Sequence, residues 1–284
     1  MHASILIATL AASMVSATPL MARQQQPSQP AFAPAPSAGS PPPPPPTTTS
    51  ITSPPVTTGQ LGKPGTPNKV PPKGLVGELL TEDTTVTRFK DIKAQIDAGA
   101  ISLKFDHNPA ANPNVTAGMG GQVDLANRAN FPVLTGLGIS SATIFFQPCG
   151  LNTPHVHPRA TEYFTLATDT KMSTGFVLEN GLTEEFKTNL TIWQGTVFPQ
   201  GSIHWQQNDD CKPAVGVAGL NSEDPGASSI AQNFLRFTSA DVVDAALGFP
   251  AEINGENFAQ FAAALPASLS KGVKECLVRC NIPH

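Results

Sequence analysis

The pattern of hydrophobic and polar positions is clearest between Gly138 and Leu220, where short apolar runs alternate with turn residues. The runs are rich in β-branched and aromatic residues, which favours strands over helices. They predict strands over residues 139–146, 163–166, 175–178, 190–193, 196–198 and 214–218. Turn sequences such as Pro148-Cys-Gly and Glu179-Asn-Gly separate the runs. Because no helical pattern lies between these strands, this part of the chain is predicted to be mainly β, as a sandwich or a barrel.

The periodicity changes after Gly226, where apolar residues recur at helical spacing. Helices are predicted over residues 239–247, 254–265 and 271–280. Ser239 is a typical N-cap residue, and acidic residues follow it in the first turn. The stripes of Ala, Leu and Phe on these helices are most simply explained as faces packed on a core.

The first quarter of the chain has a composition that opposes folding. Of the 29 prolines, 16 lie between Gln24 and Pro72, including a run from Pro41 to Pro46. A segment with so little apolar area to bury cannot offset its own chain entropy. Residues 18–73 are therefore predicted to be a disordered, proline-rich linker, and residues 74–284 to be the folded domain.

The extreme N-terminus has the features of a secretory leader. Residues 4–15 form an apolar run that is too short to span a bilayer, and small residues follow it at 15–17. This order predicts a signal peptide over residues 1–17 and a secreted protein of the extracellular space or cell wall. In a secreted chain, Asn114 and Asn189 would be N-glycosylation acceptors, since each begins an Asn-x-Thr sequence.

Charge narrows the classes of partner. Residues 74–284 hold 13 basic and 21 acidic groups, a net charge of −8. A domain of this sign has no general attraction for phosphate backbones or anionic lipid, so we expect neither nucleic-acid nor membrane binding. The basic residues of the linker are compatible with contact to a cell-wall polysaccharide, although scattered charges are more often a solvated tail.

Four cysteines fit an oxidising compartment. Cys276 and Cys280 stand close enough in sequence to close a local loop, which would leave Cys149 and Cys211 to pair across the domain. Spacing alone does not separate the three possible connectivities. The Cys-x-x-x-Cys segment is also compatible with metal binding, although the terminal His284 is the nearest histidine to it.

Two short segments bring together three of the six histidines. His155 and His157 stand two residues apart, which places both imidazoles on one face of a strand. Glu162 follows five residues after His157, so strict alternation would place it on the opposite face. A bulge or bend at Pro158 would reset that parity. His204 comes from a separate strand, after a Pro-x-Gly turn.

These four side chains form a mixed nitrogen and oxygen donor set suited to a first-row divalent ion. An octahedral ion held in this way would keep two positions open for water or a bidentate anion. A lone His-x-His pair is more often chance than a site, and His204 alone would more often be a core or rim histidine. The joint order favours a metal site: His-x-His-x-x-x-x-Glu, a β-rich interval, and then Pro-x-Gly-x-x-His.

The two segments resemble the germin motifs of the cupin superfamily. His155-Val-His-Pro-Arg-Ala-Thr-Glu162 is similar to the first motif, and Phe198-Pro-Gln-Gly-Ser-Ile-His204 to the second. Residues 131–140 resemble the approach to the first motif in germins. The resemblance is closest to germin-like and spherulin-like secreted proteins and spans roughly residues 74–265. It implies a single jelly-roll β-barrel followed by helices, with manganese bound by His155, His157, Glu162 and His204. Iron or zinc would suit the same donors.

The resemblance also bears on disulfides and assembly. In such a barrel the strand ending near Cys149 runs antiparallel beside the strand beginning near Cys211, which supports a Cys149–Cys211 disulfide. Germin-type barrels imply trimers or hexamers clasped by C-terminal helices, although the apolar stripes could equally pack within one subunit.

The match to germin-type oxalate oxidases is incomplete. Those enzymes use a substrate-binding asparagine three residues before the first histidine ligand, and Asn152 stands at that position. They use a second asparagine one strand earlier, where an ungapped count gives Ala142. The change removes a hydrogen-bond donor for the substrate, which is worth about 1–3 kcal/mol at a buried site. No cysteine precedes Cys149, so the N-terminal disulfide of plant germins is absent, and a single motif pair excludes a two-domain oxalate decarboxylase.

Two functions from different classes follow. The first is a manganese oxidoreductase in which the metal and Asn152 act on superoxide or a small carboxylate. The second is a non-enzymatic wall, matrix or storage protein of the spherulin type, in which metal and disulfides serve stability and the proline-rich segment extends the domain through a matrix. A sugar-binding or isomerising cupin is a weaker third reading.

Overall fold

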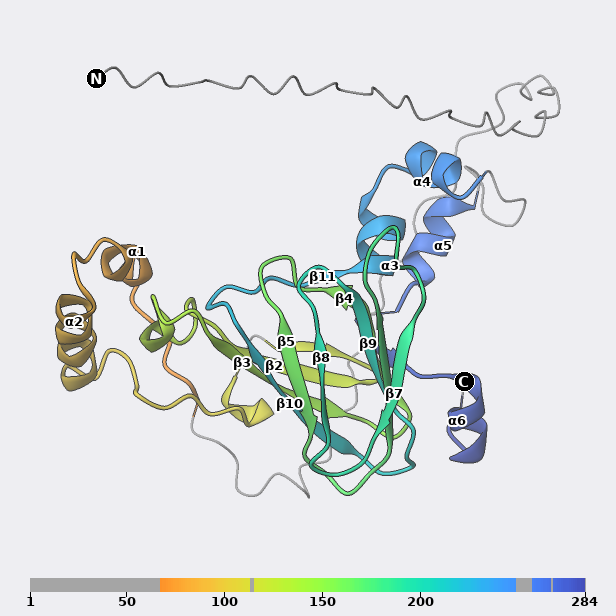
Figure 1. Cartoon of the computed structure of the whole chain (residues 1–284), viewed down its shortest axis with the longest axis horizontal. Helices are drawn as coiled ribbons and strands as arrows, with labels where there is room; N and C mark the ends of the chain where they lie inside the picture. The colour runs from red at the N-terminus through yellow and green to blue at the C-terminus, as the bar shows by residue number, and fades with distance from the viewer. Residues whose placement is uncertain (1–66, 113–114, 249–256, 267, 284) are drawn as a thin grey trace, which may run out of the picture. The chain divides into compact units, whose positions relative to one another are not determined.

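The computed structural model describes residues 67–112, 115–248, 257–266 and 268–283 (Figure 1). The predicted signal peptide, nearly all of the predicted linker and Asn114 lie outside these residues. Within the described part of the chain, no helix combines the length and the apolar character that crossing a membrane requires.

Two antiparallel sheets form the barrel (Figure 1). The first sheet contains, in spatial order, β1 (Thr116–Gly118), β2 (Gly121–Ala126), β3 (Ser140–Phe146), β10 (Ala214–Leu220), β5 (Glu162–Leu166) and β8 (Gly195–Phe198). The second contains β11 (Ser228–Ser229), β4 (Gly150–Val156), β9 (Ile203–Asn208), β6 (Met172–Val177) and β7 (Phe186–Leu190), with β12 (Leu269–Lys271) also paired to β4. Strands distant in sequence lie side by side, as β3 with β10 and β4 with β9, which is the strand order of a jelly roll. The predicted fold class is confirmed.

One predicted strand is wrong in its limits. Residues 190–193 were expected to be extended, but β7 ends at Leu190 and the chain turns immediately afterwards. Gln194 closes this turn, because its backbone N–H donates to the Thr191 carbonyl at 3.0 Å and its side-chain oxygen accepts from the Thr191 N–H at 2.9 Å. Trp193 adopts a positive φ of 64° and is largely exposed. Local hydrogen bonding thus overrides the strand propensity of this run.

Helices precede and follow the barrel strands in the sequence. They are α1 (Leu75–Leu80), α2 (Thr85–Asp97), α3 (Ile230–Gln232), α4 (Ala240–Ala246), α5 (Phe258–Ala264) and α6 (Lys274–Arg279), with the 3-10 turns η2 (Pro109–Ala111) and η3 (Pro132–Leu134) and the π-helix η4 (Asn233–Phe237). Helices are present in all three segments predicted after Gly226, as α4, α5 and α6, and residues 254–256 of the second prediction lie outside the described residues. Lys271, expected to begin the last of them, belongs instead to β12.

The N-terminal helices α1 and α2 were not predicted. α2 begins with reciprocal hydrogen bonds between Thr84 and Thr87, which satisfy free N–H groups of its first turn. Both helices contribute to a small core of their own, where Leu79 and Ile92 are almost fully buried. Upstream of them, the Asn68 N–H donates to the Ala111 carbonyl at 2.7 Å, so specific contacts begin within the segment predicted as linker.

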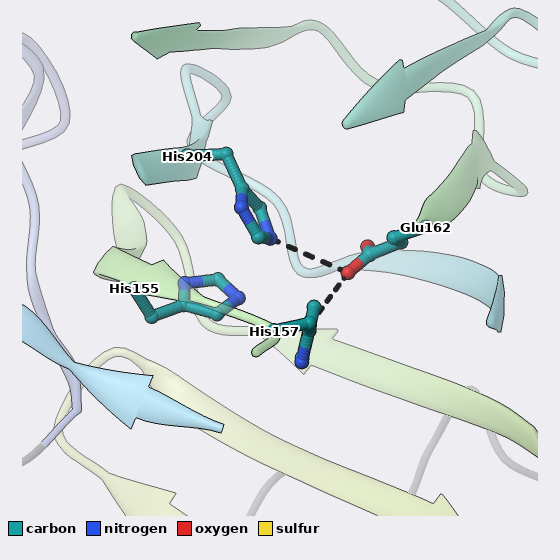
Figure 2. Close-up of side chains that lie close together, drawn as sticks. All are labelled: His155, His157, Glu162 and His204. Carbon is teal, nitrogen blue, oxygen red and sulfur yellow. Dashed lines mark ion pairs between the residues drawn. The ribbon is translucent and has the colours of Figure 1, made fainter. Parts of the chain in front are cut away.

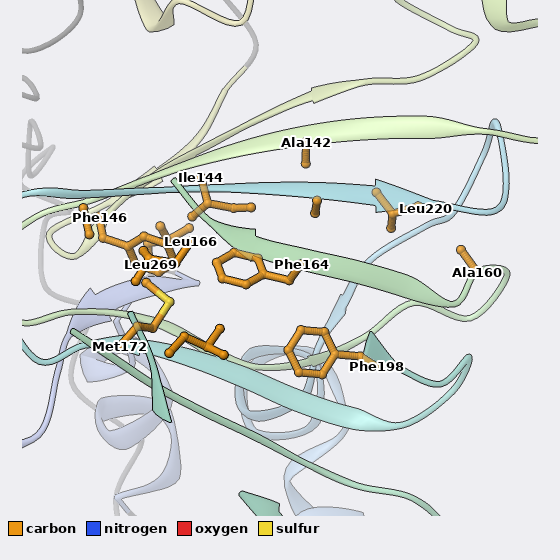
Figure 3. Close-up of a cluster of buried hydrophobic side chains, with 13 residues drawn as sticks. Ala142, Ile144, Phe146, Ala160, Phe164, Leu166, Met172, Phe198, Leu220 and Leu269 are labelled. Carbon is orange, nitrogen blue, oxygen red and sulfur yellow. The ribbon is translucent and has the colours of Figure 1, made fainter. Parts of the chain in front are cut away.

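The barrel core follows from alternation along the strands. On β3, Ala142, Ile144 and Phe146 all point inward, and cross-strand neighbours on β5 and β10 add to the same cluster (Figure 3). Phe164 is completely buried and packs over Gly216, where a Cβ atom would overlap its ring. The absence of a side chain at position 216 therefore makes room for the ring of Phe164.

The expected disulfide pairing is wrong. The structure joins Cys149 to Cys276, with Cα atoms 5.7 Å apart, and Cys211 to Cys280, with Cα atoms 5.3 Å apart. The neighbouring strand ends near Cys149 and Cys211 do run antiparallel, since Phe146 pairs with Ala214. However, α6 packs against this end of the barrel, and each barrel cysteine bonds to the helix.

The helix geometry explains this pairing. Residues four apart on a helix share a face, but their Cβ atoms are about 5–6 Å apart, which is wider than a disulfide allows. Cys276, within α6, and Cys280, directly after its last residue, therefore each bond to a barrel cysteine rather than to each other. All four sulfur atoms are used in disulfides, and the described residues hold no free cysteine for a metal.

Candidate metal centre

The four predicted metal ligands converge from both walls of the barrel (Figure 2). β4 and β9 are neighbours in one sheet, and His155 lies directly across from His204. His157 follows β4, just beyond its last residue. Glu162 is the first residue of β5, which belongs to the opposite sheet.

The parity problem of Glu162 has a simple answer. Between Val156 and Glu162 the chain leaves one sheet and enters the other, so counting alternate residues along a single strand does not apply. Glu162 faces the histidines from the opposite wall. The expectation that both His155 and His157 lie within one strand is correct only for His155.

The ligand atoms lie within 4.8 Å of one another. The Oε2 atom of Glu162 is 2.8 Å from His157 Nε2 and 3.4 Å from His204 Nε2. The rings of His155 and His204 have centroids 4.1 Å apart. His155, Glu162 and His204 are buried, and only His157 is partly accessible.

Backbone carbonyls orient all three imidazoles. Nδ1 of His155 lies 2.8 Å from the Thr153 carbonyl, and Nδ1 of His204 lies 3.0 Å from the Ser202 carbonyl. Nδ1 of His157 lies 2.6 Å from the carbonyl of Gly226. Each contact favours a proton on Nδ1, which leaves the Nε2 lone pair free to bind a metal.

The turn before His204 ties the two motifs together. Gly201 takes a positive φ of 79°, a conformation that favours glycine, and its N–H donates to the His157 carbonyl at 3.2 Å. The Ser202 hydroxyl and N–H both bond to the Pro199 carbonyl, at 2.7 and 3.0 Å. The Pro-x-Gly sequence thus fixes where β9 begins, and with it the position of His204.

Burial and charge move the pKa values of the ligands in different directions. Burial, with help from the charge of His204, lowers the pKa of His155 to about 3. Burial also acts to lower the pKa of His157, but the hydrogen bond and charge of Glu162 outweigh it and raise that pKa. For Glu162, burial acts to raise the pKa of the carboxyl, but the hydrogen bond from His157 and the nearby His204 outweigh burial and lower that pKa.

The residues fit a bound cation. His204 Nε2 is buried and has no well-formed hydrogen bond among the described residues, and the Glu162 oxygen toward which it points lies 3.4 Å away (Figure 2). An unsatisfied buried nitrogen is costly unless something binds it. Three neutral imidazoles with one carboxylate are a donor set for a first-row divalent ion such as manganese, iron or zinc.

Asn152 lies beside this centre because the strand that carries it is irregular. The register of β4 against β9 shifts by one residue between Asn152 and His155, so both residues face the barrel interior despite their odd spacing. Asn152 Nδ2 donates to Gln206 Oε1 at 2.7 Å. Ala142, at the position of the second expected asparagine, also lines the interior cavity.

One residue beside the centre was missed by the sequence analysis. Gln206 is fully buried, and its place two residues after His204 on the same strand was a signal that could have revealed it. Phe198, the first residue of the second motif, stacks its ring on that of His204 with centroids 4.5 Å apart. It therefore restricts the orientation of this ligand.

Comparisons with known proteins show the family of the chain. The family described as Cupin matches residues 107–254, slightly more than half of the chain. Spherulin-1A of Physarum polycephalum is 34% identical over 73% of this chain and 79% of its own length. A germin-like protein of Mesembryanthemum crystallinum is 44% identical over 42% of this chain and 52% of its own. A solved recombinant oxalate oxidase in complex with glycolate is 26% identical over 51% of this chain and 73% of its own, with a TM-score of 0.46. The chain belongs to the cupin family, and spherulins and germin-like proteins are its relatives.

Proposed function

We propose that this protein is a secreted manganese cupin that acts as an oxidoreductase on superoxide or on a small carboxylate. One observation carries the proposal: three Nε2 atoms and one carboxylate oxygen converge in a buried site, with each Nδ1 held by a backbone carbonyl. Secretion is supported by the apolar leader in the sequence and by the two disulfides.

The side chains of this centre have separate tasks. His155, His157, Glu162 and His204 would hold manganese, which when bound would supply a redox couple and Lewis acidity. Glu162 contributes the negative charge that offsets the ion in a buried site. The carbonyls behind the imidazoles keep the ring planes fixed, so that little reorganisation accompanies binding.

Asn152 is the candidate for contact with a substrate. It lies on the cavity wall near His155, and its bond to Gln206 fixes the plane of its amide. An amide held in this way can donate one remaining N–H to an oxygen of the ligand. The aliphatic walls around it keep bulk water away, which strengthens each polar contact inside.

Metal content and two assays test the proposal. Secreted protein should contain about one equivalent of manganese, and His155→Ala should lose it because three ligands remain. His107→Ala is the matched control, since His107 lies outside the site with Nδ1 3.2 Å from the Asp124 carbonyl. Hydrogen peroxide formation from oxalate and removal of superoxide then distinguish the two activities.

Each outcome has a clear meaning. A folded, secreted protein without metal would refute the metal centre. Full manganese loading with both assays at background would refute the enzyme and favour the matrix or storage protein. Contact with wall polysaccharide and assembly into trimers or hexamers remain proposals, to be measured by pull-down on wall material and by analytical ultracentrifugation.

A further inference from the structure

A cavity of about 300 Å³ adjoins the metal centre. This volume lies at the lower end of the range for small-molecule sites. His155, His157 and Glu162 form one part of its lining, and Asn152 lies beside them. Most of the remaining wall is aliphatic, with Val123, Leu125, Ala142, Ile144, Leu220 and Leu269.

The strand register explains why this wall is aliphatic. Within the first sheet, Leu125 pairs with Ala142 and Val123 with Ile144, so their side chains lie side by side on the inner face. On the other flank, Leu220 pairs with Glu162, which places the carboxylate at the edge of an apolar surface. A ligand that reaches the metal centre therefore has hydrocarbon on this side of the barrel (Figure 3).

The cavity lacks a positive charge apart from a bound metal and any protonated histidine. None of the side chains that line it in the described part of the chain is Lys or Arg, and Glu162 is the only acidic one. Oxalate is short enough to reach the metal with both carboxylates, but the second carboxylate of a longer diacid such as pentanedioate would lie in this wall without a cationic partner. Burying an unpaired carboxylate costs several kcal/mol, so the cavity disfavours such a longer dianion.

The polar groups of the cavity suit one carboxylate. Asn152 has one N–H engaged by Gln206, so it offers a single further N–H next to the histidines. The position where germin-type oxalate oxidases carry a second asparagine holds Ala142, which extends the aliphatic wall. Three hydroxyl side chains, Thr116, Ser229 and Ser268, also line the cavity, and those of Ser229 and Ser268 bond to each other at 2.7 Å. Away from the metal centre the wall therefore carries hydroxyls but no charge that could pair with a second carboxylate.

We infer that the cavity selects a small organic acid with one carboxylate and an aliphatic body. Its carboxylate binds at the metal and Asn152, and its hydrocarbon lies against Ala142, Ile144 and Leu220. The inference rests on the proposed function for the carboxylate end, but the aliphatic wall is a property of the fold alone.

A chain-length series tests it. Manganese-loaded protein is titrated with acetate, propanoate, butanoate, pentanoate and pentanedioate, and affinity is read from the paramagnetic relaxation of ligand protons. Affinity should rise about fourfold for each added methylene of the monoacids until the cavity is full, and pentanoate should bind more tightly than pentanedioate. Equal affinity along the series, or pentanedioate as the tightest ligand, would overturn the inference while leaving the metal centre intact.

Two variants and a control show where the hydrocarbon of the ligand lies. Ala142→Asn adds an amide to the wall and should weaken pentanoate binding about tenfold while narrowing its advantage over pentanedioate. Ala246→Asn, the same change at an exposed position of α4, should alter neither. Should the buried amide prevent folding, Leu220→Ala widens the wall without polarity, and the preferred chain should become longer. If the folded variants keep the chain-length preference of the parent protein, the proposed contact between the ligand and this wall is refuted.

A protein that takes up no metal would refute the proposed function instead. The wall is then tested alone with primary alcohols from ethanol to pentanol, which need no metal, by saturation-transfer NMR on the metal-free protein. Binding that strengthens with chain length would uphold the aliphatic wall, and binding without such dependence would overturn it.

Discussion

Acidification tests the protonation states of the metal centre, because an imidazole must be neutral to bind a metal. The pKa of His155 is lowered to about 3 by burial and by the charge of His204. The pKa of His157 is raised, because the hydrogen bond and charge of Glu162 outweigh burial. The pKa of the Glu162 carboxyl is lowered, so this ligand stays ionised over the range in which histidines titrate. The ligands therefore respond to acid one after another.

The size of the effect follows from counting protons. Each imidazole that must lose a proton reduces the apparent metal affinity about tenfold per pH unit below its pKa. Three imidazoles with ordinary values would lower the affinity about a thousandfold between about pH 6 and pH 5. His155 remains neutral until the pH approaches about 3, so it adds nothing to this slope. We therefore expect the metal affinity to fall about a hundredfold at most between about pH 6 and pH 5.

The assay is manganese affinity by chelator competition at a series of pH values. Proton release is counted by calorimetry in buffers of different ionisation enthalpy. A thousandfold loss of manganese affinity between about pH 6 and pH 5 would refute the conclusion that His155 is neutral in this range. Glu162→Gln should lower the pKa of His157, since burial then acts without its opposing carboxylate, and NMR titration of the metal-free protein reads this directly. Glu184→Gln, the same change in an exposed loop, should leave the titration of His157 as it was.

Three further predictions concern stability and processing. The double variant Cys211→Ser, Cys280→Ser removes a disulfide with a sequence separation of 69 and should lower the free energy of unfolding by about 2–4 kcal/mol. An unchanged Tm would contradict this pairing. Gly216→Val places methyl groups against the ring of Phe164 and should lower the free energy of unfolding, measured with denaturant, by about 1–3 kcal/mol. An unchanged midpoint of unfolding would show that the core has room for the side chain. Asn189 is exposed on β7, so secreted protein should lose one N-glycan in Asn189→Gln; identical gel mobility of the variant and the parent would count against occupancy.

The ligand set was predictable because it is encoded locally. His155 and His157 lie within one short segment, and His204 follows a turn whose Pro and Gly have fixed conformational roles. The runs of apolar residues predicted a sandwich or a barrel, and the resemblance to germins implied that the barrel is a jelly roll. Local hydrogen bonding and side-chain alternation are properties that a sequence displays directly.

Other features depend on contacts between distant segments and could not be predicted. The inward position of Glu162 requires knowing that the chain crosses between sheets, and the inward position of Asn152 requires a bulge in β4. The disulfide pairing depends on where α6 docks, which its six residues do not reveal. The aliphatic cavity wall is a consequence of register across several strands, so single residues such as Ala142 gain meaning only beside their neighbours.

The disulfides and the metal ligands act on the two ends of one strand pair. β4 begins directly after Cys149 and carries His155 near its other end, while β9 begins with Ile203 and His204 and ends three residues before Cys211. Cys149 is bonded to Cys276 and Cys211 to Cys280, at the C-terminal helix. The two disulfides therefore hold the pair of strands β4 and β9 at the end away from the ligands. A slip of one residue between β4 and β9 would turn a ligand away from the interior. The disulfides oppose such a slip, and so the same covalent bonds that stabilise the fold keep His155 opposite His204 before any metal arrives.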